Sequence, residues 1–112
     1  GGESTSVTTS ESVFYHYGFA ADESKFANGL RPGSYATTTG DLTGQGAKSG
    51  LSLPHANAPD SVYQVTPGVG TPINGPSTVA PQFGQPGGGQ EVTFPQGTGP
   101  GTVGPATPIP PQ

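Results

Sequence analysis

Glu91 is the most informative acidic residue of the chain. It is the only charged residue among the 52 that follow Asp60, and it stands directly after the letters GGGQ and directly before the apolar letters VTF. Glycines let another molecule approach the backbone, and a carboxylate beside such a run, with no charged neighbour in sequence, is typical of a working acid. The alternative is a solvent-facing strand residue, which is the commoner fate of a glutamate. Its isolation among neutral residues favours a function.

Two aromatic side chains are further candidates for chemistry. His16 lies within the letters VFYHY, where a neutral imidazole can offer one donor and one acceptor to a sugar hydroxyl or an amide. A structural histidine satisfied by the backbone is an equally good explanation. Tyr35 follows the turn letters RPG, and a ring in that position could stack on a flat heterocycle. Core packing is the more frequent explanation for a single tyrosine.

Short elements must position these residues. Runs of β-branched and aromatic residues bounded by Gly and Pro indicate strands. Helix formers followed by Gly29 indicate one short helix with Phe26 and Leu30 buried, and Thr43 can cap a second. The predicted strands are 13–17, 34–38, 61–66, 71–74 and 91–94, and the predicted helices are 20–28 and 43–50. We therefore expect a small, strand-dominated α+β fold with one or two short helices and long Gly/Pro loops.

The domain organisation follows from composition. The chain has 112 residues, including 20 Gly and 14 Pro, but its net charge is only −4 and it has nine aromatic residues, four Tyr and five Phe, to bury. This balance favours one compact domain over a disordered chain. We expect a flexible lead-in at 1–12, the domain at 13–96 and an extended surface tail at 97–112. Because the chain contains no Met, we also expect it to be a processed piece of a longer protein.

The same composition excludes several classes. No apolar run is long enough to span a membrane, and the absence of Cys removes disulfide scaffolds and thiolate metal sites. His16 and His55 lack the spacing of metal ligands, so we expect no metal. Three cations against seven acidic residues argue against a nucleic-acid binder.

The order of these features resembles a known enzyme family. The letters YHYG at 15–18, a short helix ending before Leu30, YATTT at 35–39, Ala47 and Glu91 on a late strand together resemble the H-Y-E branch of ADP-ribosyltransferases, typified by diphtheria toxin and the poly-ADP-ribose polymerases. The resemblance covers residues 13–94. The letters VAPQFGQPGGGQE at 79–91 resemble the C-terminal toxin domains of Rhs and other polymorphic bacterial toxins, and the tuberculosis necrotizing toxin family, whose members hydrolyse NAD.

The resemblance implies a fold and a set of roles. The fold would be the split β-sheet of ADP-ribosyltransferases, and the substrate would be NAD+. His16 would hydrogen-bond a ribose of NAD+, Tyr35 would stack on the nicotinamide ring, and Glu91 would be the catalytic residue that binds the 2′-hydroxyl of the nicotinamide ribose. Further cofactor-binding positions would be Gly18, Thr37 and Phe26.

The sequence departs from the family at two places. The second aromatic that several members carry on the helix after the Tyr strand is absent, and Phe26 is one residue that could replace it. Gln90 directly precedes Glu91, which puts arginine as the acceptor in doubt.

The function implied is that of a toxin, a mono-ADP-ribosyltransferase delivered as part of a larger secreted bacterial protein to the cytoplasm of a target cell. The acceptor would be a macromolecule, protein ahead of RNA, with translation components among the candidates. A cognate immunity protein would protect the producer. An NAD+ glycohydrolase toxin is the first alternative, and a Pro/Gly-rich binding module without catalysis is the second.

Overall fold

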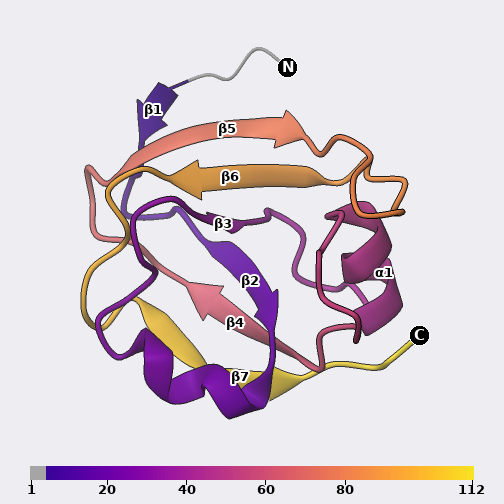
Figure 1. Ribbon diagram of the computed structural model, residues 1–112. Coiled ribbons are helices and arrows are strands. Elements are labelled where there is room, and N and C mark those ends of the chain that lie inside the picture. The colour runs from indigo at the N-terminus through magenta and orange to yellow at the C-terminus, as the bar shows by residue number, and fades with distance from the viewer. Residues whose placement is uncertain (1–4) are drawn as a thin grey trace.

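Two antiparallel sheets form the centre of the molecule (Figure 1). The computed structural model describes residues 5–112. One sheet has four strands in the order β1-β5-β6-β3, and the other has three in the order β2-β4-β7. The bounds are β1 Thr5–Val7, β5 Pro72–Thr78, β6 Gln90–Phe94 and β3 Ser34–Ala36, then β2 Phe14–Gly18, β4 Ser61–Val65 and β7 Val103–Pro108. The predicted strand-dominated α+β class is confirmed, whereas the closer likeness to ADP-ribosyltransferases stays a prediction.

The main core lies between the two sheets. Alternate residues of β6, Val92 and Phe94, are fully buried, and Phe94 meets Phe14 of β2 edge to face with ring centroids 5.5 Å apart. The cluster comprises Phe14, Leu30, Ala36, Val65, Ile73, Val92 and Phe94. Because Val92 and Phe94 face this core, the alternate residues Glu91 and Thr93 face the other way.

The two helices are short. The predicted helix over 20–28 is a 3₁₀ helix, η1 (Ala20–Phe26), rather than an α-helix, since a stretch this short forms few α-helical hydrogen bonds. Gly29 follows at φ 85°, the left-handed conformation expected of it, and a Cβ there would clash with the Gly99 carbonyl. Helix α1 (Gly44–Gly50) begins as predicted, because the Thr43 side chain accepts the Gly46 N–H at 3.0 Å.

Within residues 5–112, an isolated bridge joins the two sheets. Tyr15 of β2 and Thr37, just after β3, exchange two backbone hydrogen bonds of 2.8 Å. The bridge holds β2 beside β3. His16 follows the bridge residue Tyr15, and Tyr35 is the central residue of β3, so the two become neighbours. The tertiary pairing of β2 with the end of β3 therefore positions the candidate site.

The chain ends differ from the expectations. Residues 97–112 do not form a separate surface tail: β7 pairs with β4, and Thr98 and Thr102 are buried. In the predicted lead-in, residues 1–4 lie outside the described part of the chain, but β1 pairs with β5 and Thr8 is buried. Strand β5 also runs to Thr78, beyond the predicted 71–74. Each difference arises because pairing with a distant strand orders a segment whose own sequence is a weak strand former.

Candidate functional site

Tyr35 and Glu91 line the same cavity, which has a volume of about 310 Å³. This Tyr35–Glu91 cavity lies between the sheet and the segments around α1. Its other walls are the segment after α1, the end of β5 and the turn beyond it, formed by Leu51, Ser52, Leu53, Pro54, Ser77, Thr78, Val79, Ala80, Gln82 and Phe83. The volume falls at the lower end of the roughly 300–1,000 Å³ typical of small-molecule sites. The cavity can therefore accept a ring with a sugar.

Strand register places Tyr35 and Glu91 on one face of the sheet. Tyr35 pairs with Thr93 of β6, and Glu91 lies two residues before Thr93, hence on the same face as both. Such diagonal neighbours lie within reach of long side chains. Burial raises the pKa of the Tyr35 phenol to about 12, and the nearby charge of Glu91 adds to the rise. The tyrosine is therefore a neutral ring and hydroxyl throughout the physiological range.

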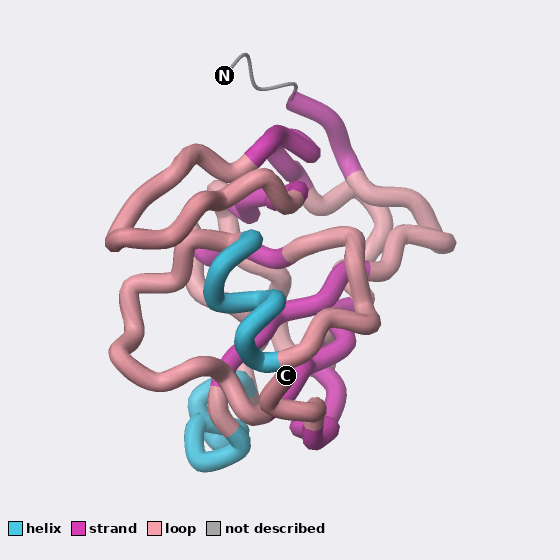
Figure 2. The backbone as a smooth tube through the Cα atoms, turned by 90° about the vertical axis from the view of Figure 1, so that its right-hand side faces the viewer, coloured by secondary structure: helices cyan, strands magenta, loops and turns pink. Residues whose placement is uncertain are grey.

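The glycine run before Glu91 has a structural role that differs from the expected one. A Cβ on Gly87 would lie 2.5 Å from the Val79 carbonyl oxygen, and one on Gly89 would lie 2.9 Å from that of Gly50. Gly87 and Gly89 also donate backbone hydrogen bonds of 2.9 Å to the end of α1, at Ser49 and Gly50. The close approach is thus made by the protein's own backbone. The run fixes the loop before Glu91 against α1, the helix that faces the viewer in Figure 2.

His16 contacts Tyr35 but lines a different cavity. Its Nδ1 lies 2.9 Å from the backbone oxygen of Tyr35, and the two rings are tilted with centroids 5.2 Å apart. A carbonyl oxygen only accepts, so Nδ1 carries the proton. Burial lowers the pKa of His16. Two smaller effects act on it: the hydrogen bond to Tyr35 raises the pKa, and the charge of His55 lowers it further. The neutral ring therefore leaves Nε2 as an acceptor.

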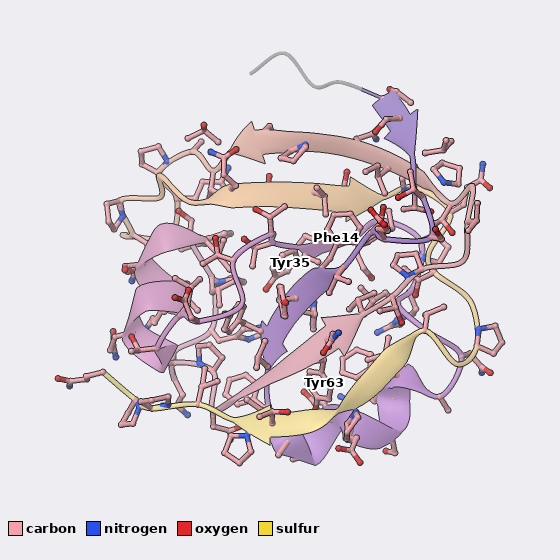
Figure 3. All side chains as sticks on the ribbon, turned by 180° about the vertical axis from the view of Figure 1, so that it is seen from behind. Phe14, Tyr35 and Tyr63 are labelled. Carbon is pink, nitrogen blue, oxygen red and sulfur yellow. The ribbon has the colours of Figure 1, made fainter. Side chains whose placement is uncertain are left out.

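The second cavity, of about 230 Å³, we call the His16–Arg31 cavity. Its lining comprises His16, Asp22, Lys25, Phe26, Gly29, Arg31 and Ser34. Phe26 belongs here, edge-on to His16 at 5.4 Å and to Tyr63 at 4.8 Å, and is not among the residues that line the Tyr35–Glu91 cavity. Figure 3 labels Tyr35, on β3 of the four-stranded sheet, and Tyr63, on β4 next to β7. The structure thus groups Tyr35 with Glu91, and His16 with Phe26.

Gly18 and Thr37 lie on the framework around these cavities. The Gly18 carbonyl at the end of β2 accepts the Asp60 N–H at 3.0 Å. Thr37 is 1% exposed, and its Oγ1 accepts the Thr39 N–H at 3.2 Å. Neither residue is among those lining the Tyr35–Glu91 or the His16–Arg31 cavity. Their part in binding a cofactor stays a prediction.

Phe83 lines the candidate site, and the sequence analysis missed it. It lines the Tyr35–Glu91 cavity with 63% of its surface exposed, at the tip of a turn closed by backbone hydrogen bonds of 3.2 and 2.8 Å between Gln82 and Gln85. Its φ is 53°, a left-handed conformation that costs a non-glycine residue about 1–2 kcal/mol. The available signal was a bulky aromatic beside Gly84 in an otherwise polar turn. An exposed, strained aromatic at the rim of a cavity is typical of a ligand contact.

Two further properties concern the described residues only. Within residues 5–112, no group of three or more His, Cys, Asp or Glu side chains is arranged to hold a metal ion. No helix in that range is long and apolar enough to cross a membrane.

Comparison of the chain with protein-family models, curated proteins and solved structures found no match in any of the three.

Proposed function

We propose that this chain is a toxin domain that binds NAD+ in the Tyr35–Glu91 cavity, cleaves its nicotinamide–ribose bond and transfers ADP-ribose to a macromolecule. The observation that carries the proposal is that Tyr35 and Glu91, which the resemblance pairs as ring platform and acid, line one cavity. His16, the third residue of that set, is hydrogen-bonded to the backbone of Tyr35. Three residues far apart in sequence thus lie in one connected group.

The nicotinamide would lie between Tyr35 and Phe83. Both aromatic side chains line the cavity, one from the sheet and the other from the turn at its rim. Aromatic faces bind flat heterocycles, and two faces exclude water better than one. Phe83 would therefore take the place of the second aromatic that the sequence lacks at the expected position. Phe26 would not fill that place, because it lines the other cavity.

Glu91 would stabilise the charge that develops on the ribose. When the C1′–N bond breaks, its electron pair leaves with the nicotinamide nitrogen, the nicotinamide becomes neutral, and positive charge develops on the sugar. A carboxylate held against the 2′-hydroxyl favours that transition state over the ground state. A nucleophile of the acceptor then bonds to C1′ and loses its proton to water. Capture by water in place of the acceptor would make the domain a glycohydrolase.

His16 would orient a ribose of the dinucleotide. Its Nδ1–H is committed to the Tyr35 carbonyl, so Nε2 accepts a hydrogen bond and needs a donor such as a sugar hydroxyl. A hydroxyl bound there is fixed relative to the Tyr35 backbone. The His16–Tyr35 pair would thus hold the sugar and the nicotinamide in one pose.

The setting proposed is the cytoplasm of a target cell, after delivery as part of a larger bacterial protein. The producing cell would need an immunity protein that covers the Tyr35–Glu91 cavity. The chain carries a net charge of −4, so basic residues on that partner would favour association.

The test is incubation of the purified domain with NAD+ labelled in its adenylate half and with target-cell lysate. A transferase labels a discrete macromolecular band, and Glu91→Gln should lower that labelling at least a hundredfold, the effect of losing one transition-state contact. Glu11→Gln, which removes an exposed carboxylate outside both cavities, is the matched control and should keep full activity.

The other outcomes discriminate among the alternatives. Release of free ADP-ribose without a labelled band, again lost in Glu91→Gln, would identify the NAD+ glycohydrolase. Intact NAD+ in the presence of a folded domain would reject both enzymes and leave the binding module.

A further inference from the structure

The cations of this chain are concentrated at one cavity. The sequence has only three Lys and Arg residues, and two of them, Lys25 and Arg31, line the His16–Arg31 cavity. The third, Lys48, is on α1, where its Nζ donates to the Ala56 carbonyl at 2.7 Å. Two of the three cations around one cavity make its lining more basic than the rest of this acidic chain.

The charge balance of this cavity is positive. Asp22 is the only carboxylate in the lining, and its Oδ1 lies 3.1 Å from Lys25 Nζ. Arg31 makes no ion pair with any residue of the described range 5–112. Because His16 is neutral, two cations and one carboxylate leave a net charge of +1, against −4 for the whole chain. Arg31 is therefore the cation of this cavity that can pair with an entering anion without first breaking an ion pair.

The other lining groups suit a phosphate ester better than a simple anion. A guanidinium presents a planar fork of donors that matches phosphate oxygens, and Lys25 and the Ser34 hydroxyl can add single donors. His16 Nε2 accepts a hydrogen bond, so it suits a sugar hydroxyl next to the phosphate and not the phosphate itself. Phe26 supplies an apolar wall. These groups together match a phosphate attached to a ribose.

We propose that the His16–Arg31 cavity binds the phosphate groups of a phosphorylated ribose ligand, through Arg31 and Lys25. The inference rests on the proposed function in assigning these phosphates to the dinucleotide bound in the neighbouring cavity. His16 lines one cavity and bonds to Tyr35, which lines the other, so a ligand with two linked nucleosides would span that contact. Each cavity alone, at about 310 and 230 Å³, would hold one part of it.

The experiment measures binding and needs no catalysis. The full isotope-labelled chain is titrated at constant ionic strength with pyrophosphate, with ADP and with nicotinamide riboside, and backbone amide signals are followed by NMR. Pyrophosphate and ADP should shift the signals of residues 22–34, whereas nicotinamide riboside, which has no phosphate, should shift those lining the Tyr35–Glu91 cavity. ADP should bind more tightly than pyrophosphate because it also provides a ribose. Pyrophosphate matching ADP in affinity would contradict the ribose part of the proposal.

Three variants separate a specific site from general charge. Arg31→Gln should weaken ADP binding about tenfold, the effect of one charge-assisted hydrogen bond. Lys48→Gln makes the same change of charge away from the cavity and should change the affinity by less than about twofold. Asp22→Asn removes the carboxylate that competes for Lys25 and should tighten ADP binding several-fold. All three residues belong to surface segments, and retained NMR dispersion confirms the fold of each variant.

The opposite results would overturn the inference. Equal weakening by Arg31→Gln and Lys48→Gln would show general attraction, and unchanged affinity in Asp22→Asn would show that Lys25 takes no part. Shifts confined to residues other than His16 and 22–34 would place the phosphates elsewhere. ADP binding here without any NAD+ cleavage would retain this site and reject the proposed enzyme, whereas cleavage that depends on Glu91 without ADP binding here would do the reverse.

Discussion

The imidazole of His16 donates a hydrogen bond from Nδ1 to the backbone carbonyl oxygen of Tyr35, at 2.9 Å, across the junction of the two sheets. This bond sets the tautomer of His16 and leaves Nε2 as the acceptor. It also connects the two cavities, because His16 lines one and Tyr35 the other. The consequences for stability and for ligand binding can each be measured.

Acid should destabilise the fold through His16. Burial lowers the pKa of His16 below its ordinary value of 6.5, so the unfolded state binds the proton more strongly than the folded state. Its contribution to stability is therefore present above pH 6.5 and is lost as the pH falls through the lowered pKa. Urea unfolding between pH 8 and pH 5 measures this slope. In His16→Gln the slope should be much smaller, whereas His55→Gln, at an exposed histidine that makes only the smallest contribution to the shift, should retain most of it. An identical slope in both variants would assign the effect to other groups.

Alkali should destabilise the fold through Tyr35. The pKa of its phenol is raised from 10.0 to about 12, first by burial and then by the charge of Glu91, so the folded state holds the proton more tightly. This contribution to stability is present below pH 10 and is lost as the pH rises toward 12. Burial also raises the pKa of Tyr17 and Tyr63, so ultraviolet titration of the folded protein should show several late-ionising tyrosines, with one fewer in Tyr35→Phe. The free energy of unfolding of Tyr35→Phe should decline less between pH 10 and pH 12 than that of the unsubstituted chain.

Phe83→Asn should separate stability from ligand binding. Asparagine tolerates positive φ better than phenylalanine, and the Phe83 ring is 63% exposed, so the free energy of unfolding should stay equal or rise by up to about 1 kcal/mol. The KM for NAD+ should rise several-fold because one face of the ring site is lost.

Val69→Asn is the control for Phe83→Asn. It removes another exposed apolar side chain, 73% exposed and outside the Tyr35–Glu91 cavity, and should leave KM unchanged. A large loss of stability in Phe83→Asn, with KM unaltered, would mean that the ring serves the fold.

Removal of residues 97–112 should abolish cooperative folding. Strand β7 covers β4 from Val65 to Ser61, and Thr98 accepts the buried Leu30 N–H at 2.8 Å. Without them one edge of β4 loses its partner strand and a buried backbone donor loses its acceptor. Thermal or urea unfolding followed by circular dichroism should show no sharp transition, whereas removal of Gln112 alone should leave it intact. A cooperative transition in the long truncation would support the surface tail that the sequence suggests.

Local sequence was sufficient for the elements that depend on local physics. Aromatic and β-branched runs predicted β2, β4 and β6, Thr43 predicted the start of α1, and Gly29 predicted a left-handed residue after the first helix, because side-chain sterics and a hydroxyl cap act within a few residues. The number and order of these predicted strands and helices likewise predicted the α+β class. Glu91, His16 and Tyr35 were recognised as candidates from their types and spacing alone.

Tertiary structure decided the relations between distant residues. The letters VGPATP carry little strand signal, yet residues 103–108 form β7 because the edge of β4 supplies their hydrogen-bond partners. The distribution of candidates between two cavities, the contact of the glycine run with α1 and the position of Phe83 at the cavity rim all require segments that lie far apart along the chain to meet. Such meetings depend on how whole sheets pack, and pattern within a short stretch carries no information about which distant backbone will lie against it.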